Sequence, residues 1–78
     1  MKKIENSECQ LQFGEFIRKG RELRGMSQTD LGLAVDLDQS YISKIERGSK
    51  NRNIDYVLAL KLCQALNLDL REFIKQYM

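Results

Sequence analysis

Apolar residues recur every three or four positions along most of the chain, and no stretch alternates cleanly between apolar and polar residues. This spacing is typical of amphipathic α-helices and argues against β-strands. The pattern predicts an all-α fold of five helices, at approximately residues 12–23, 27–35, 39–47, 53–66 and 70–76.

Residues that commonly begin or end helices stand at the boundaries of these ranges. Ser27 with Asp30, and Asp69 with Glu72, each form the pattern of a capping box at the start of a helix. The other expected caps are Asp38 and either Asn53 or Asp55, and the expected C-terminal stops are Gly25, Gly48 and Asn67.

The apolar side of each helix predicts what is buried. We expect the core to include Phe13, Phe16, Ile17 and Leu23 from the first helix, Leu31, Ala34 and Val35 from the second, and much of the fourth. The stripe on the last helix consists of Leu70, Phe73, Ile74 and Tyr77. Little chain remains to cover that stripe, so it packs on the first and fourth helices or meets its copy in another subunit.

The third helix is different because most of its positions are polar. Ile42 and Ile45, three residues apart, can anchor it, while the polar positions are Gln39, Ser40, Ser43, Lys44 and Arg47. A face of hydrogen-bonding and basic side chains suits a DNA groove. The alternative is an ordinary solvated face.

A chain of 78 residues predicts one domain of modest stability, which a partner subunit would increase. We expect a DNA-binding domain over residues 11–78, preceded by a polar leader over residues 1–10 whose order the sequence leaves open. No apolar run approaches the roughly 20 residues that span a membrane, and no signal-peptide core follows Lys2 and Lys3. We therefore expect a cytoplasmic protein without a membrane partner.

The chemistry available to the chain is limited. Histidine is absent, which removes the commonest general base and metal ligand. The spacing of Cys9 and Cys63 matches no metal or redox motif. We interpret Cys63 as a core residue and Cys9 as a thiol in the leader that forms no disulfide. The sequence thus predicts neither an enzyme nor a cofactor, a metal site or a small-molecule ligand.

The net charge of +2 says little about nucleic acid, but the distribution of charge says more. One basic cluster consists of Lys44, Arg47, Lys50 and Arg52, and a second consists of Arg18, Lys19, Arg21 and Arg24. Localised basic clusters on a nearly neutral domain fit phosphate binding, although they also fit simple solubility.

The segment 27–48, SQTDLGLAVDLDQSYISKIERG, reads as two short helices joined by a tight turn, which is a helix-turn-helix. Its second helix enters the major groove, where residues at the N-terminal end, here Gln39 and Ser40, reach the base edges. Ser27 and Gln28 stand at a helix N-terminus, where backbone N–H groups favour a phosphate.

The chain resembles the Cro/C1-type helix-turn-helix family of phage repressors and bacterial regulators. The resemblance runs from about residue 13 to residue 73. It rests on Arg21, the Met26-Ser27-Gln28 start, Leu31, Tyr41-Ile42-Ser43, Ile45-Glu46-Arg47-Gly48 and Ala65-Leu66-Asn67-Leu68. It implies a compact, five-helix, lambda-repressor-like domain that binds double-stranded DNA.

The resemblance also implies roles for single residues. The residues expected to face bases are Gln39, Ser40, Ser43 and Lys44. Those expected to meet the DNA backbone are Ser27, Gln28, Tyr41, Arg47, Lys50, Asn51 and Arg52. Gln28 should also support the recognition helix. Arg21 and Glu46 match a partly buried salt bridge between the first and third helices.

Four features depart from the family pattern, one of which is Gly32 in place of a common alanine in the second helix. Gly20 replaces a large aliphatic residue, which indicates a weak first helix or an unusually close neighbour. Asp36 stands where glycine often makes the turn, and aspartate tolerates a positive φ better than most residues. The connector after Gly48 is about two residues longer than in the family, which puts the phosphate contacts of the loop 50–52 in doubt.

Within the family, the chain looks most like the small controller proteins of restriction–modification systems. That resemblance implies a homodimer at a pseudo-palindromic operator near its own promoter, with activation first and repression at higher occupancy. The expected dimer interface is Leu68, Leu70, Phe73, Ile74 and Tyr77. The alternatives are a Cro/C1-like repressor of a phage or mobile element and an antitoxin-type protein-interaction module.

Overall fold

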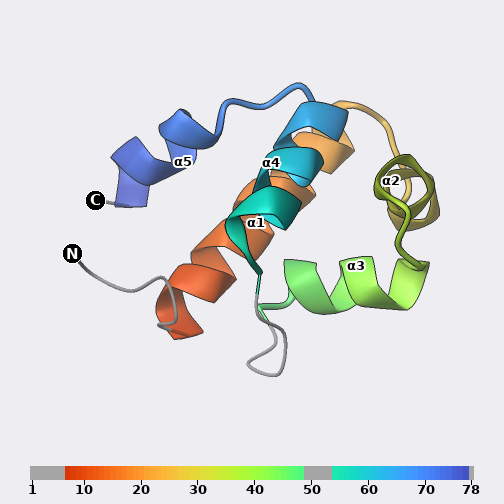
Figure 1. Cartoon of the computed structure of the whole chain (residues 1–78), viewed down its shortest axis with the longest axis horizontal. Coiled ribbons are helices and arrows are strands. Elements are labelled where there is room, and N and C mark those ends of the chain that lie inside the picture. The colour runs from red at the N-terminus through yellow and green to blue at the C-terminus, as the bar shows by residue number, and fades with distance from the viewer. Residues whose placement is uncertain (1–6, 49–53, 78) are drawn as a thin grey trace.

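The computed structural model describes residues 7–48 and 54–77, and these ranges contain helices and no strands. The five helices are α1 (Ser7–Leu23), α2 (Gln28–Val35), α3 (Gln39–Glu46), α4 (Tyr56–Ala65) and α5 (Leu70–Tyr77). Figure 1 shows α2 and α3 at one end of the molecule and α5 at the other, where it contacts α1 and α4. The predicted all-α fold of five helices is confirmed.

Helix α1 begins at Ser7, five residues before the expected start at Gln12, so the expected boundary after residue 10 falls inside this helix. The apolar stripe reaches one turn further toward the N-terminus, because Cys9 lies four residues before Phe13. Cys9 is only 2% exposed, and neither it nor Cys63 forms a disulfide. The prediction that Cys9 lies in a polar leader was therefore wrong.

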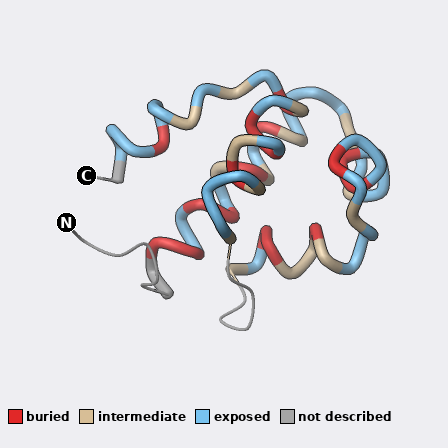
Figure 2. Tube along the Cα trace, viewed as in Figure 1, coloured by how far each residue is buried: buried red, intermediate tan, exposed pale blue. Residues whose placement is uncertain are grey.

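The core gathers residues from all five helices. The largest fully buried side chains are Ile17, Leu31, Ile42, Ile45, Leu62 and Leu66. Figure 2 shows that the buried positions of α3 face the rest of the molecule. Two expectations were wrong, because Leu23 and Ala34 are exposed. The inner face of α2 is centred on Leu31, Gly32 and Val35, which leaves Ala34 on the flank.

Most of the predicted caps are confirmed. Ser27 and Asp30 form a reciprocal capping box, and Asp38 and Asp55 cap α3 and α4 through their carboxylates. Asn67 takes the expected left-handed conformation, with φ of 55°. The last helix differs, since the carboxylate of Asp69 accepts from the backbone N–H of Arg71 at 3.0 Å, while the backbone N–H of Glu72 donates to the Asp69 carbonyl oxygen. Its carboxylate also pairs with the Arg71 guanidinium, which competes for the same oxygens.

Gly20 marks a close approach, which was one of the two explanations offered for its departure from the family pattern. It is buried, and a Cβ atom built there would lie 2.6 Å from Cδ1 of Leu68, on the connector between α4 and α5. The Leu68 side chain can lie directly over α1 here because glycine carries no side chain.

We expect stability to fall between about pH 9 and pH 11 because of Cys63. Burial, and secondarily the negative charge of Asp69, raise the pKa of its thiol from 9.0 to about 11. The pKa of the Cys63 thiol is higher in the folded than in the unfolded protein, so the folded protein keeps the thiol proton to a higher pH. The stability that depends on this neutral thiol is fully present below the unfolded pKa and is lost as pH rises through the folded pKa. Urea unfolding of Cys63→Ala and of the unsubstituted protein at pH 8 to 11 checks it. The unsubstituted protein should lose more stability, and parallel curves would contradict the assignment.

Candidate nucleic-acid interface

Helices α2 and α3 form a helix-turn-helix whose turn is residues 36–38. Asp36 ends α2 in the left-handed conformation, with φ of 63°, and Asp38 then caps α3. The aspartate at position 36 therefore supplies the positive φ that glycine often provides. The two helices contact each other, and Figure 1 shows α3 along the outer edge of the molecule.

The four residues expected to face bases occupy one face of α3. Positions 39, 40, 43 and 44 are separated by one, three and one residues, which places them on one side of a helix. Gln39 and Ser40 are exposed, whereas Ser43 and Lys44 are half-buried. Ser40 also donates from Oγ to Oδ1 of Asp38 at 2.8 Å, so its hydroxyl takes part in the cap.

Four of the seven residues expected at the DNA backbone fall within the described part of the chain. Ser27 caps α2 and is exposed, and Gln28 and Tyr41 are half-buried. Arg47 is exposed at the C-terminal cap of α3. The remaining three, Lys50, Asn51 and Arg52, lie outside the described residues.

The predicted salt bridge between α1 and α3 is present. Nε of Arg21 donates to Oε2 of Glu46 at 2.7 Å, and Nη2 donates to Oε1 at 3.1 Å. Nη1 of Arg21 also donates to the carbonyl oxygen of Met26 at 2.8 Å. The two side chains are only 12% and 3% exposed. Hydrogen bonding to Glu46 raises the pKa of Arg21 above its ordinary value, although burial opposes this rise.

The salt bridge continues into a chain of hydrogen bonds that the sequence pattern did not predict in detail. Nε2 of Gln28 donates to Oε1 of Glu46 at 3.0 Å. Nε2 of Gln39 in turn donates to Oε1 of Gln28. These contacts connect α1, α2 and both ends of α3. The expected support of the recognition helix by Gln28 therefore has a direct basis, and the sequence signal is a glutamine at the first position of both α2 and α3.

The expected dimer interface requires a correction at Phe73. Its ring packs edge-on against Phe13, with centroids 5.3 Å apart, and also against Phe16. At 7% exposure, Phe73 belongs to the core of the single chain. Of the two arrangements expected for the stripe of α5, the structure shows packing on α1 at Phe73.

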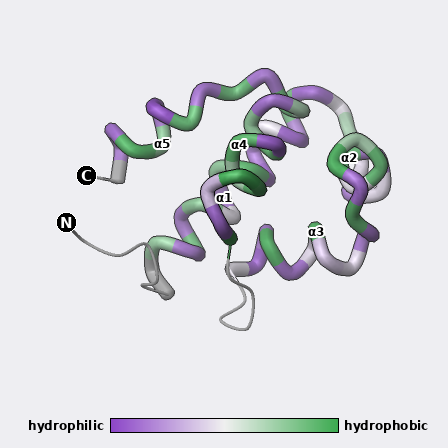
Figure 3. The backbone as a smooth tube through the Cα atoms, viewed as in Figure 1, coloured by the Kyte–Doolittle hydropathy of each residue, from purple (hydrophilic) through white to green (hydrophobic). Residues whose placement is uncertain are grey.

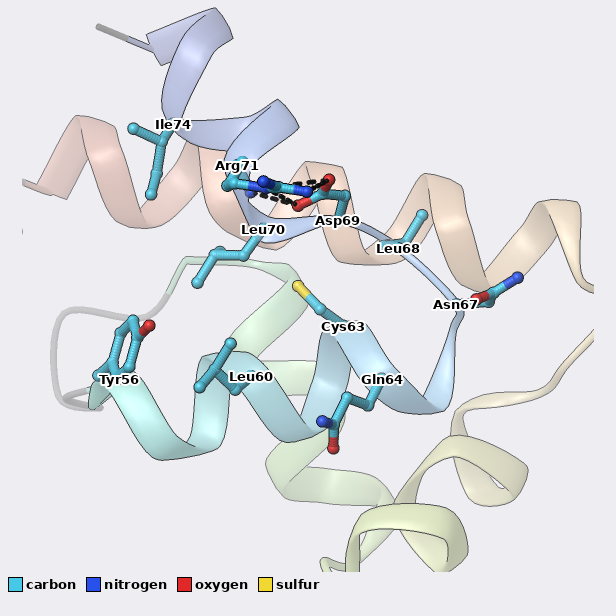
Figure 4. Close-up of a pocket in the computed structure, with 10 residues that line it drawn as sticks. All are labelled: Tyr56, Leu60, Cys63, Gln64, Asn67, Leu68, Asp69, Leu70, Arg71 and Ile74. Carbon is cyan, nitrogen blue, oxygen red and sulfur yellow. Dashed lines mark hydrogen bonds and ion pairs between the residues drawn. The ribbon is translucent and has the colours of Figure 1, made fainter.

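The other expected interface residues differ in exposure. Leu68 and Leu70 are half-buried against the core, Ile74 is 41% exposed, and nothing is described of the Tyr77 side chain. Figure 4 shows the hollow between α4 and α5, whose lining includes the apolar Tyr56, Leu60, Leu70 and Ile74 and the polar Gln64, Asn67, Asp69 and Arg71. Its volume is about 440 Å³. Figure 3 shows hydrophilic and hydrophobic positions alternating along α5. The surface between α4 and α5 therefore combines exposed apolar side chains, Tyr56 and Ile74, with polar ones.

No described helix is both long and apolar enough to cross a membrane. Within residues 7–48 and 54–77, no cluster of acidic and cysteine side chains could hold a metal ion.

A family profile described as helix-turn-helix matches residues 17–73. No curated protein sequence matches the chain. Among solved structures, the chain is similar to the restriction–modification controller protein C.AhdI from Aeromonas hydrophila, with 37% identity and a TM-score of 0.75. That alignment covers 86% of this chain and 94% of the other.

A second similar structure is the clp gene regulator ClgR from C. glutamicum. Its identity is 23% and its TM-score 0.75, and the alignment covers 83% of this chain and 82% of that one. At this identity the likeness concerns the fold alone.

Proposed function

Because the chain belongs to the Cro/C1-type helix-turn-helix family of DNA-binding transcriptional regulators, we propose that it binds a pseudo-palindromic operator as a homodimer. The observation that carries this proposal is the polar face of α3, which presents Gln39, Ser40, Ser43 and Lys44 together beside a capped helix-turn-helix. In this motif the second helix reads the major groove.

Each polar side chain of this face has a chemical role in the proposal. Gln39 and Ser40, at the exposed N-terminal end of α3, reach base edges, with Gln39 contacting adenine through two hydrogen bonds. Ser43 and Lys44 contact bases one turn further along the groove. Ser27, Gln28, Tyr41 and Arg47 contact phosphates, which supply most of the affinity and make it depend on salt. Lys50, Asn51 and Arg52 are proposed to extend these phosphate contacts.

The dimer is proposed to form through the surface between α4 and α5. Ile74, Leu68, Leu70 and Tyr77 are the contact residues, and Phe73 supports them from the core. The two-fold axis then sets the recognition helices about 34 Å apart, one turn of DNA.

The resemblance to a controller protein over most of the chain supports a narrower proposal. The protein regulates a restriction–modification system, acts in the cytoplasm, and binds near its own promoter, with activation preceding repression. This role needs DNA and a second copy of the chain, and it needs no cofactor or small-molecule ligand.

Selection of bound duplexes from a random DNA pool at physiological salt tests the function. A two-fold-symmetric motif with half-sites about one helical turn apart is the expected result. Recovery of no motif by a folded, dimeric protein would contradict the proposal and favour a protein-interaction module. The recovered motif can then be sought upstream of the gene itself.

Ile74→Asp tests the dimer. A charge placed in an apolar contact surface should raise the dimer dissociation constant at least roughly tenfold, because the carboxylate is desolvated there without a partner. Sedimentation equilibrium measures the change. Leu33→Asp is the matched control, since Leu33 is 77% exposed on α2, away from α5. Equal dissociation constants for the two variants would exclude this interface.

A further inference from the structure

Glu46 is buried at the C-terminal end of α3, and both of its carboxylate oxygens accept hydrogen bonds. Oε2 accepts from Nε of Arg21, whereas Oε1 accepts from Nη2 of Arg21 and from Nε2 of Gln28. An ionised carboxylate can only accept hydrogen bonds. The atom of Gln28 that faces Glu46 must therefore be its amide nitrogen, because the amide oxygen could only accept.

The orientation of Gln28 determines that of Gln39. With its nitrogen facing Glu46, Gln28 presents its carbonyl oxygen to the N-terminal end of α3. A carbonyl oxygen can only accept, so Gln39 must meet it with its amide nitrogen. The direction of donation thus runs from Gln39 to Gln28 to Glu46.

This direction of donation determines which donor and acceptor groups of the Gln39 amide are available to contact DNA. One N–H is engaged by Gln28, and the carbonyl oxygen and the second N–H remain. Adenine presents an N7 acceptor and an N6 donor in the major groove, whereas guanine presents two acceptors, N7 and O6. One acceptor and one donor match adenine and mismatch guanine.

We propose that Glu46, without touching DNA, is a specificity-determining positioning residue that sets the amide orientation of Gln39 and so favours adenine over guanine at one position of each half-site. The proposal rests on the proposed DNA-binding function. It assigns the preference to the charge of Glu46, because a neutral amide at position 46 could donate to Gln28. That donation would allow the whole chain of amides to reverse and Gln39 to present two donors.

Glu46→Gln tests this step, because it keeps the size of the side chain and removes its charge. The operator recovered by selection is varied to adenine or guanine at the position whose preference Gln39→Ala abolishes. In the unsubstituted protein we expect the adenine duplex to bind roughly tenfold to a hundredfold more tightly than the guanine duplex. In Glu46→Gln this ratio should fall by about tenfold, toward equal binding.

Arg21→Lys is the matched control. It weakens the same salt bridge, but it leaves the carboxylate in place as an acceptor for Gln28. Both variants should melt earlier than the unsubstituted protein, and only Glu46→Gln should change the base ratio. An unchanged ratio in Glu46→Gln, or an equal loss in Arg21→Lys, overturns the proposal.

Gln28→Met keeps the test decisive if Glu46→Gln does not fold, since it leaves the Arg21–Glu46 contacts intact. Breaking the hydrogen bonds from Gln39 through Gln28 to Glu46 should lower the ratio of affinities for the adenine and guanine duplexes. Loss of a phosphate contact alone would weaken binding to both duplexes equally. A ratio equal to that of the unsubstituted protein overturns the proposal. Failure of the proposed function is distinct, because then the selection yields no motif to vary.

Discussion

Glu46→Ala is expected to lower the free energy of unfolding by about 3 kcal/mol, because it leaves the Arg21 guanidinium poorly solvated without its carboxylate partner. Arg21 is 12% exposed, and its remaining contact is the carbonyl oxygen of Met26. Gln28 also loses its acceptor. In a domain of this size, such a loss corresponds to a melting temperature about 15 °C lower. Thermal and urea unfolding followed by circular dichroism measure both quantities.

Glu22→Ala is the control, because Glu22 also pairs with an arginine, Arg18, but at the surface. Exposed pairs one turn apart on a helix contribute about 0.5 kcal/mol or less. Arg21→Met combined with Glu46→Ala should be more stable than the sum of the single changes predicts, since no unpaired buried charge remains. If Glu46→Ala lowered the free energy of unfolding by as little as Glu22→Ala does, the interpretation of Arg21 and Glu46 as a desolvated ion pair would be contradicted.

The helix-turn-helix was predictable because its signals are local. The side chains of Ser27 and Asp38 cap α2 and α3 by accepting hydrogen bonds from backbone N–H groups only three residues further along the chain. Asp36 makes the turn through its positive φ angle. None of these features needs a distant partner to form. The inner face of α3 was predictable for the same reason, because Ile42 and Ile45 are its only strongly apolar side chains apart from Tyr41.

The predictions that failed depend on which elements meet in space. The stripe of α5 was recognised, but whether Phe73 covers α1 or a second copy is decided by Phe13 and Phe16, nearly sixty residues away in the chain. The start of α1 was missed because Cys9 reads as part of a polar segment until its packing is known. The hydrogen bonds that connect Gln39, Gln28 and Glu46 could not be predicted either. A periodic pattern places Gln28 and Gln39 on helices, but it does not give the orientation of their side-chain amides.

Gly14→Ala is expected to destabilise the protein by about 2 kcal/mol, although alanine is the better helix former by about 1 kcal/mol. Helix α1 lies against the C-terminal end of α3 at this position. A Cβ atom at Gly14 would lie 2.7 Å from the carbonyl oxygen of Glu46 and closer still to that of Ile45. These obstacles are backbone atoms, so α3 itself must move. Urea unfolding, and binding to the selected operator, measure the consequences.

Gly20→Ala separates crowding by backbone from crowding by a side chain. The nearest obstacle there is Cδ1 of Leu68, which is the end of a flexible side chain and can turn away. The free energy of unfolding of Gly20→Ala should therefore differ from that of the unsubstituted protein by less than about 1 kcal/mol, because the gain in helix propensity offsets the cost of repacking Leu68. Because Gly14 sits against the backbone that carries Glu46, only Gly14→Ala should also weaken operator binding. Equal effects of the two alanines would contradict the close backbone contact between α1 and α3 as the cause of the expected loss.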